Sequence, residues 1–131
     1  MILADTSVLI DFFKGNSTVA VSKLKAALSR KLHIGITSGI FQELLQGAKS
    51  EKEFNLLKRY LETQHFYHPK HSVESYVEAA KIYMSCRKKG ITVRSTADCL
   101  IARIAIEHDL LLLHNDADFI AMAKVVDLKL F

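Results

Sequence analysis

The chain begins with Ile2-Leu3-Ala4-Asp5-Thr6-Ser7-Val8-Leu9-Ile10, and this stretch decides the fold. Three apolar residues without polar alternation predict a short strand that is buried on both faces. Thr6 or Ser7 can cap a helix that begins at Val8, because a side-chain oxygen there accepts a hydrogen bond from a free backbone N–H. The chain therefore opens as strand, turn and helix, the repeating unit of proteins with a parallel sheet.

The same alternation continues to the end of the chain. Further strands are predicted at 33–36, 64–69, 110–113 and 125–128. Apolar residues at helical spacing predict helices at 8–13, 19–29, 38–46, about 50–61, 72–89, 95–106 and 118–123. We therefore expect an α/β fold in three layers, α/β/α, with a central parallel sheet of four to five strands.

Two of these helices carry apolar residues that we expect in the core. In the helix that Ser72 opens, the inward face is predicted to consist of Val73, Tyr76, Val77, Ala80 and Tyr83. The helix at 50–61 is predicted to bury Phe54, Leu57 and Leu61.

Length and composition predict one ordinary globular domain over residues 1–131. Half of the 131 residues are apolar and 24% are charged, which excludes a disordered or low-complexity chain. No apolar run is long enough to span a membrane, and the first residues lack the features of a secretory signal, so we expect a cytoplasmic protein. Cys86 and Cys99 have no disulfide or metal-ligand spacing and are predicted to be buried thiols.

Charge is segregated along the chain. Residues 12–97 hold fifteen Lys or Arg against six Glu, whereas residues 1–11 and 98–131 together hold three basic residues against eight acidic ones. Every aspartate lies in these terminal stretches: Asp5, Asp11, Asp98, Asp109, Asp116, Asp118 and Asp127. If the two ends fold side by side, an acidic centre lies within a basic surround, a pattern that suits a cation site acting on a polyanion.

Two of the aspartates follow predicted strands directly. Asp5 ends the first strand, and Asp116 comes shortly after the strand at 110–113. In a parallel sheet the carboxyl ends of strands form the crevice where ligands bind, so both carboxylates are predicted at one edge. Each also has a purely structural interpretation, Asp5 as a helix cap and Asp116 as a polar loop residue.

Two further carboxylates lie on predicted helices. Asp98 shares a helix face with Ala102 and Ala105, which indicates a desolvated carboxylate, although a capping box with Ser95 would also explain it. Glu43 lies about 130° from the centre of its helix's apolar stripe, so by itself it is typical of a solvated flank. Carboxylates within about 4 Å of one another repel by roughly 4 kcal/mol per pair at an effective dielectric near 20. Oxygen ligands alone select Mg²⁺ or Mn²⁺, and such an ion can activate a water.

These residues stand in motifs that resemble a PIN domain, and more narrowly the VapC-type toxins of toxin–antitoxin pairs. The motifs are Asp5-Thr6-Ser7, Glu43-Leu44, Thr96-Ala97-Asp98-Cys99-Leu100-Ile101-Ala102 and Leu112-Leu113-His114-Asn115-Asp116-Ala117-Asp118-Phe119. They occur in this order at suitable intervals, and the resemblance covers essentially the whole chain.

The resemblance implies a Mg²⁺- or Mn²⁺-dependent endoribonuclease that leaves 5′-phosphate and 3′-hydroxyl ends. It also implies a homodimer and a VapB-type antitoxin whose C-terminal segment enters the acidic groove. Asp5 and Asp98 match direct metal ligands, and Glu43 and Asp116 complete the catalytic quartet through waters, a second ion or orientation of the attacking water. Thr6 and Ser7 match positions that support the site through hydrogen bonds.

One position departs from the family pattern. Many relatives have a hydroxyl residue where this chain has Leu113-His114, so the fourth acid is either Asp116 or Asp118, and Asn115 can also reach the site. The basic residues nearest in sequence to Asp98 are predicted to bind RNA, although a solvated helix end would also account for them. They are Arg87, Lys88, Lys89 and Arg94.

Three other interpretations stay open. A receiver-like signalling domain also keeps acids and Mg²⁺ at strand ends, but it needs a phosphoacceptor aspartate after its third strand, and none occurs between Phe12 and Ala97. A PIN-like scaffold would bind RNA or protein without cutting. Zinc is a weak possibility at His65, His68 and His71, because Pro69 interrupts any helix there.

Overall fold

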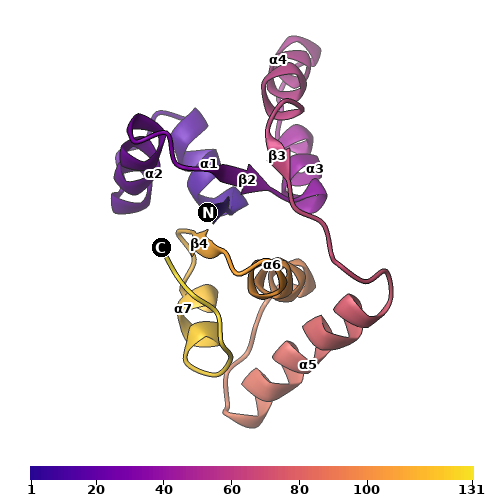
Figure 1. The fold of residues 1–131 in the computed structure, drawn as a ribbon. Coiled ribbons are helices and arrows are strands. Elements are labelled where there is room, and N and C mark those ends of the chain that lie inside the picture. The colour runs from indigo at the N-terminus through magenta and orange to yellow at the C-terminus, as the bar shows by residue number, and fades with distance from the viewer.

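The structure is a computed structural model that describes all of residues 1–131, with four strands and seven helices (Figure 1). In chain order they are β1 (Ile2–Ala4), α1 (Thr6–Phe13), α2 (Val19–Ser29), β2 (Ile34–Ile36), α3 (Ser38–Gln46), α4 (Glu51–Leu61), β3 (His65–Phe66), α5 (Glu74–Lys88), α6 (Thr96–Glu107), β4 (Leu111–Leu113) and α7 (Ala117–Ala123). None of the helices has both the length and the apolar character that crossing a bilayer requires.

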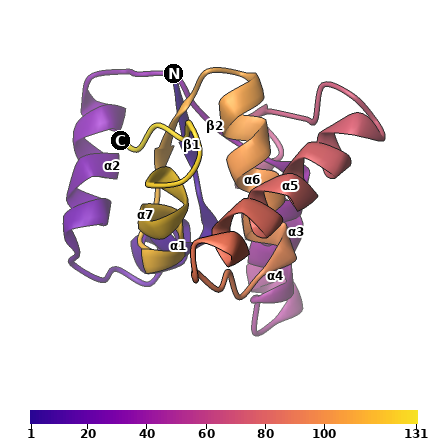
Figure 2. The same cartoon turned by 90° about the horizontal axis from the view of Figure 1, so that it is seen from below.

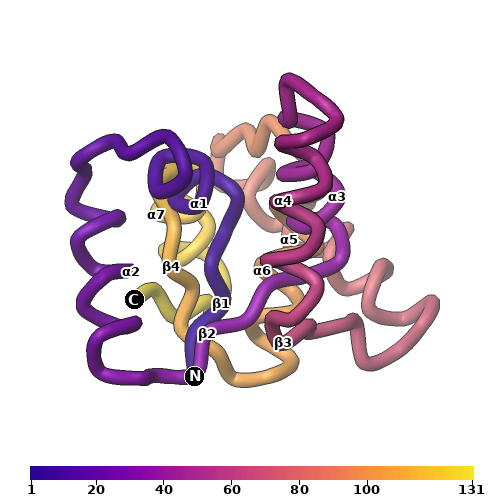
Figure 3. The backbone as a smooth tube through the Cα atoms, turned by 90° about the horizontal axis from the view of Figure 1, so that it is seen from above, coloured from indigo at the N-terminus to yellow at the C-terminus, as the bar shows by residue number.

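The strands form one parallel sheet in the order β3-β2-β1-β4. Helices α1 to α4 cover one face of the sheet, and α5 to α7 cover the other, as the views from the two sides show (Figures 2 and 3). All three residues of β1 are buried, which explains why the strand is a continuous apolar run. The predicted three-layer α/β/α fold is confirmed.

The pairing of β1 with β4 brings the two ends of the chain together. Leu3 lies opposite Leu112, and Ala4 lies opposite Leu113. Each strand is therefore followed by residues at the same, carboxyl end of the sheet: Asp5 after β1 and the 114–118 segment after β4. The two acidic ends of the sequence are thus neighbours in space, which is the condition under which their charges form one acidic centre.

The predicted strand at 125–128 is wrong. After α7 the backbone N–H groups of Val125 and Val126 both donate to the Met122 carbonyl, so the chain turns instead of extending. It reaches the sheet edge only at Leu130, which forms an isolated bridge with Leu112. The sheet consequently has four strands.

The predicted inward face of the long helix is wrong except at Tyr83, which is partly buried against the core. Helix α5 begins at Glu74, and its buried residues are Ser75, Ala79, Ile82 and Cys86. Val73 and Tyr76 are 71% and 54% exposed, and Val77 is exposed as well. Small side chains on the buried stripe let α5 lie close to α6, and this close approach outweighs the burial of larger residues. Phe54 of α4 is likewise exposed, whereas Leu61 is buried.

Gly35 in β2 is required by the close approach of Tyr67. A Cβ at position 35 would lie 2.4 Å from Tyr67 Cε2 and 2.9 Å from the carbonyl oxygen of His65. Tyr67 is 6% exposed, so neither its ring nor the neighbouring backbone has room to move. We expect Gly35→Ala to lower the free energy of unfolding by about 3 kcal/mol in chemical denaturation.

Gly39→Ala is the matched control for that substitution. The nearest atom to a Cβ there is Thr37 Oγ1 at 3.7 Å, and the residue is helical, so Ala should stabilise the protein by roughly 0.5–1 kcal/mol. Equal stabilities for the two variants would contradict this interpretation of Gly35.

Candidate active site

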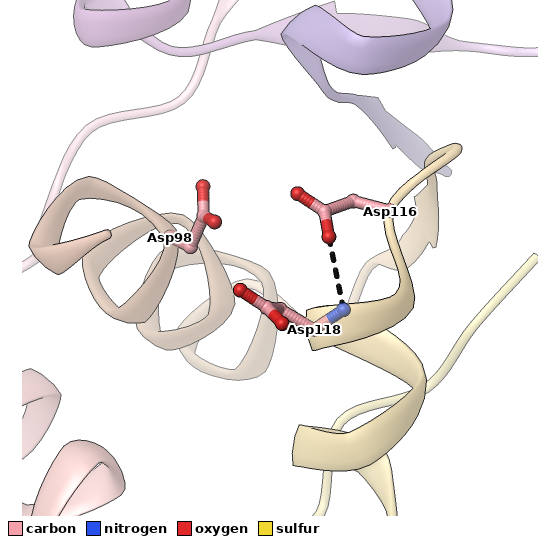
Figure 4. Close-up of side chains that lie close together, drawn as sticks. All are labelled: Asp98, Asp116 and Asp118. Atoms are coloured by element: carbon pink, nitrogen blue, oxygen red, sulfur yellow. Dashed lines mark hydrogen bonds between the residues drawn. The ribbon is translucent and has the colours of Figure 1, made fainter. Parts of the chain in front are cut away.

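Three aspartates gather beyond the carboxyl end of the sheet. Asp98 comes from the first turn of α6, Asp116 precedes α7, and Asp118 lies in its first turn. Figure 4 shows their side chains directed toward a common space, and one carboxylate oxygen of each lies within 4.8 Å of those of the other two. Residues 98 and 116–118, far apart in sequence, thus form one acidic cluster, here defined as Asp98, Asp116 and Asp118.

Asp5 is buried between β1 and α1 and caps the helix. Its Oδ2 accepts hydrogen bonds from the backbone N–H of Ser7 at 3.1 Å and from Ser7 Oγ at 2.6 Å. The helix therefore begins at Thr6 with Asp5 as its cap, and the prediction that Thr6 or Ser7 would be the cap is wrong. A carboxylate is favoured at this position because it accepts two hydrogen bonds and its negative charge suits the positive end of a helix.

Ser7 ties Asp5 to the loop that carries the acidic cluster. Its Oγ donates to Asp5 and accepts a hydrogen bond from the backbone N–H of Asn115 at 2.8 Å. The Asn115 side chain in turn donates to Asp11 Oδ2 at 3.1 Å. Ser7 and Asn115 thus fix the start of α1 against the loop before α7, which supports the relative placement of Asp5 and Asp116.

Removing the Ser7 hydroxyl should destabilise this junction. Ser7→Ala leaves the Asn115 N–H without its acceptor and removes a 2.6 Å bond to Asp5, so we expect the free energy of unfolding to fall by about 2 kcal/mol. Ser7→Thr, which keeps the hydroxyl, should lose less. The exposed Ser22→Ala on α2 is the matched control, and a loss at Ser7 no larger than at Ser22 in chemical denaturation would refute this role.

Burial and mutual repulsion govern the protonation of these acids. The pKa of Asp98 is raised from 3.8 to about 7, first by desolvation and then by the charges of Asp5, Asp116, Asp118 and Glu43. Desolvation also raises the pKa of Asp5, against the hydrogen bonds from Ser7 that lower it. Neither Asp5 nor Asp98 belongs to an ion pair. Without a cation, the site therefore holds its central carboxylate at high electrostatic cost.

Glu43 lies on α3, outside the acidic cluster. It is exposed on α3 and shares with the buried Thr6 the wall of a cavity of about 140 Å³. Its charge acts on both Asp5 and Asp98 and raises the pKa of each. Glu43 is thus an exposed residue whose negative charge adds to the repulsion among the buried acids.

Two of the aspartates are also helix caps. Asp5 and Asp116 are both helix N-caps, Asp116 accepting a hydrogen bond from the backbone N–H of Asp118, so capping and the site share the same residues. The capping box does not form, because the Ser95 side chain makes no capping hydrogen bond. Asp98 lies in the first turn of α6, where a carboxylate suits the positive end of the helix without any capping box.

Two contacts of the cluster were not expected from the sequence. Arg94 pairs with Asp118 and Asp116, with Nε 3.3 Å from Asp118 Oδ2 and Nη2 3.6 Å from Asp116 Oδ1. His114 Nδ1 accepts a hydrogen bond from the Asp116 backbone N–H at 3.0 Å. The first pairing joins residues 24 apart that no local spacing connects. The hydrogen bond between His114 and Asp116 joins residues two positions apart, the spacing at which side chains in turns commonly bond to the backbone.

Arg87, Lys88 and Lys89 lie exposed at the end of α5 and form no ion pair. The Arg87 guanidinium lies over the Tyr83 ring, 5.9 Å from its centroid. These three charges are therefore open to a polyanion.

The histidines hold no metal-like arrangement. The acidic cluster is the one group of carboxylate, imidazole or thiol side chains with ligand atoms close enough to share an ion. The histidines near β3 instead contact aromatic rings, with centroid distances of 4.5 Å between His65 and Tyr67 and 6.3 Å between Phe66 and His68. The weak zinc interpretation of His65, His68 and His71 therefore finds no support.

The acidic residues fit a hard divalent cation. Every candidate ligand is a carboxylate, which suits Mg²⁺ or Mn²⁺ and not zinc or copper. The raised pKa of Asp98 has desolvation and four neighbouring negative charges as its causes, and a divalent ion would reverse the effect of both.

Comparisons with known proteins agree with this arrangement. The PIN domain family matches residues 2–125. VapC ribonuclease Mb1587 of Mycobacterium bovis and ribonuclease VapC11 of Mycobacterium tuberculosis are each 34% identical to the chain, with 98% of this chain and 96% of the relative covered.

Solved structures share the fold at lower identity. In VapBC2 from Rickettsia felis, crystallised with a DNA fragment from its promoter, one chain matches at 18% identity with a TM-score of 0.76, covering 100% of this chain and 98% of that one. A chain of VapBC-1 from nontypeable Haemophilus influenzae matches at 20% identity with a TM-score of 0.74, covering 100% of this chain and 97% of that one. Because the family model covers residues 2–125 and full-length relatives are 34% identical, the chain belongs to the PIN-domain family, among the VapC ribonucleases.

Proposed function

We propose that the protein is a Mg²⁺- or Mn²⁺-dependent endoribonuclease and the toxin of a toxin–antitoxin pair. The observation that carries the reaction is the half-buried Asp98, whose pKa of about 7 reflects burial among four other carboxylates with no cation paired to it. The names of full-length relatives, VapC ribonuclease and ribonuclease VapC11, support RNA as the substrate.

In this proposal Asp5 and Asp98 would hold the ion, because they are the carboxylates of the site whose pKa is raised by burial. When bound, a divalent ion lowers the pKa of a coordinated water and offsets charge on a phosphodiester. Ser7 keeps Asp5 oriented through its 2.6 Å hydrogen bond. Glu43 and Asp116 orient the attacking water. The water oxygen gives up a proton and bonds to phosphorus as the bond to the 3′ oxygen breaks, and the leaving 3′ oxygen takes up a proton from solvent, which leaves a 5′-phosphate and a 3′-hydroxyl.

The basic surround supplies affinity for the RNA backbone. Arg87, Lys88 and Lys89 are exposed and unpaired, and Arg94 lies beside the acidic cluster. Contacts of Lys and Arg with phosphates give binding that weakens as salt rises and that does not depend on base sequence.

A VapB-type antitoxin is the partner we propose, on the strength of structural neighbours that are VapBC complexes. The same proposal places the protein in the cytoplasm, where Cys86 and Cys99, both free and buried, need no oxidising environment. Pairing with a second copy stays a prediction, which light scattering can test.

The proposal is tested by cleavage of a structured RNA with the purified protein. Activity should require Mg²⁺ or Mn²⁺, disappear with EDTA and return with excess metal, and the product ends should be 5′-phosphate and 3′-hydroxyl. RNA binding without cleavage under any divalent ion would instead favour a non-catalytic scaffold. Stable phosphorylation by a small phosphodonor would favour a receiver-like domain.

A further inference from the structure

Arg94 and Asp118 form a pair of contacts that sets Asp118 apart from the other acids of the site. The backbone N–H of Arg94 donates to Asp118 Oδ2 at 3.2 Å, and Arg94 Nε donates to the same oxygen at 3.3 Å. Both the main chain and the side chain of Arg94 are therefore held by one carboxylate oxygen. The segment before α6 is tied to the first turn of α7 at this point.

Asp116 is engaged differently. Its Oδ1 accepts a hydrogen bond from the backbone N–H of Asp118 at 2.9 Å, and Arg94 Nη2 lies 3.6 Å away, too far for a hydrogen bond. The guanidinium thus pairs closely with Asp118 and only loosely with Asp116. Of the two aspartates left open as the fourth acid, Asp118 has the closer, hydrogen-bonded contact with Arg94, and Asp116 has only the longer ion pair.

The guanidinium itself keeps most of its donors free. Arg94 is exposed, with 74% of its side chain accessible, although Nε is fixed by Asp118. The planar group has five N–H donors, and the Nη atoms make no hydrogen bond within the chain. A guanidinium that is anchored at one edge and open at the other is suited to bidentate contact with a phosphate.

From these contacts we propose that Asp118 is a positioning residue and not a metal ligand, and that it orients Arg94 so that the guanidinium binds an RNA phosphate beside the acidic cluster. Asp116 is then the fourth acid. This inference rests on the proposed function and divides its residues between two tasks. Asp98 and Asp116 serve the metal and the water, while Asp118 and Arg94 serve the substrate.

A double-mutant cycle tests this division. Arg94→Ala should raise the KM for a structured RNA about tenfold with kcat changed less than threefold, since the contact binds a phosphate and does not act on the reacting atoms. Asp118→Ala should give the same KM effect, and the double variant should be no worse than either single variant, because both remove one interaction. Arg94→Lys, which keeps the charge but loses the fork, should recover only part of the loss.

The second measurement is Mn²⁺ binding to each variant by titration calorimetry. Arg94→Ala and Asp118→Ala should bind Mn²⁺ within about threefold of the parent, whereas a lost ligand typically costs more than tenfold. Lys129 and Asp109, an exposed ion pair at the opposite edge of the sheet with a 2.8 Å contact, supply the matched controls Lys129→Ala and Asp109→Ala.

Two results would overturn the assignment. One is a tenfold or greater loss of Mn²⁺ affinity in Asp118→Ala, and the other is effects of the two substitutions on KM that multiply in the double variant. The first would make Asp118 a member of the metal site, and the second would show that Asp118 does not act through Arg94. Failure of the nuclease proposal looks different, because the parent itself would then not cleave RNA with any divalent ion, whatever the variants do.

Discussion

Asp98→Asn should lower kcat/KM for RNA cleavage by at least about a thousandfold, because the amide can neither carry the charge nor give the metal affinity of the carboxylate. Asp98 is the site's most strongly perturbed group, with its pKa raised to about 7 by desolvation and the charges around it. The substitution keeps the shape of the side chain, so the fold should survive. Initial rates on a labelled RNA at saturating Mg²⁺ measure the effect.

The comparison needs two further variants. Asp5→Asn should show a loss of similar size, because Asp5 is the other buried carboxylate of the site. Asp109→Asn, at an exposed aspartate paired with Lys129, should keep the parent's rate. If Asp5→Asn and Asp98→Asn both stayed within twofold of the parent, these carboxylates would not form the catalytic centre.

The same Asp98→Asn variant should be more stable than the parent when no metal is present at pH 8. Folding raises the pKa of Asp98 from 3.8 to about 7, so between these values the native protein keeps a proton that the unfolded chain has lost. The parent therefore loses stability as pH rises through this window, and the loss is complete above pH 7. The amide has no such penalty.

The gain from Asp98→Asn should be about 2 kcal/mol at pH 8. A shift of this size corresponds to roughly 4 kcal/mol for a fully buried group, and solvent screening of a half-buried carboxylate reduces it by about half. Below pH 4 the two proteins should be equally stable. Urea denaturation in EDTA at pH 4 and pH 8 measures this difference, and a variant less stable than the parent at pH 8 would contradict the electrostatic description of the site.

Sequence patterns predicted the sheet and the acidic site because both depend on local rules. Buried parallel strands are apolar on both faces, so β1 and β4 could be recognised as continuous runs. The carboxyl ends of such parallel strands lie at the same end of the sheet, so the sequence alone predicted Asp5 and Asp116 at that end. Asp98 could be identified because a carboxylate on an otherwise apolar helix face is costly to bury without a cation or a hydrogen-bond donor.

Features that depend on packing could not be predicted in this way. The buried stripe of α5 includes small residues such as Ala79 beside Ile82, and only the close approach of α6 shows why the larger Tyr76 stays outside. The pairing of Arg94 with Asp118 has the same cause, because the segment before α6 meets the first turn of α7 there. The spacing of residues in the sequence does not predict such a tertiary contact.

Titration of the metal-free protein with Mn²⁺ at pH 8, followed by calorimetry, tests the central claim most directly. The converging carboxylates predict saturable binding that weakens at pH 5.5, where Asp98 is protonated and must release its proton, and binding at least about tenfold weaker in Asp98→Asn. Equal affinity of the parent and Asp98→Asn for Mn²⁺, or no dependence on pH between 5.5 and 8, would contradict it.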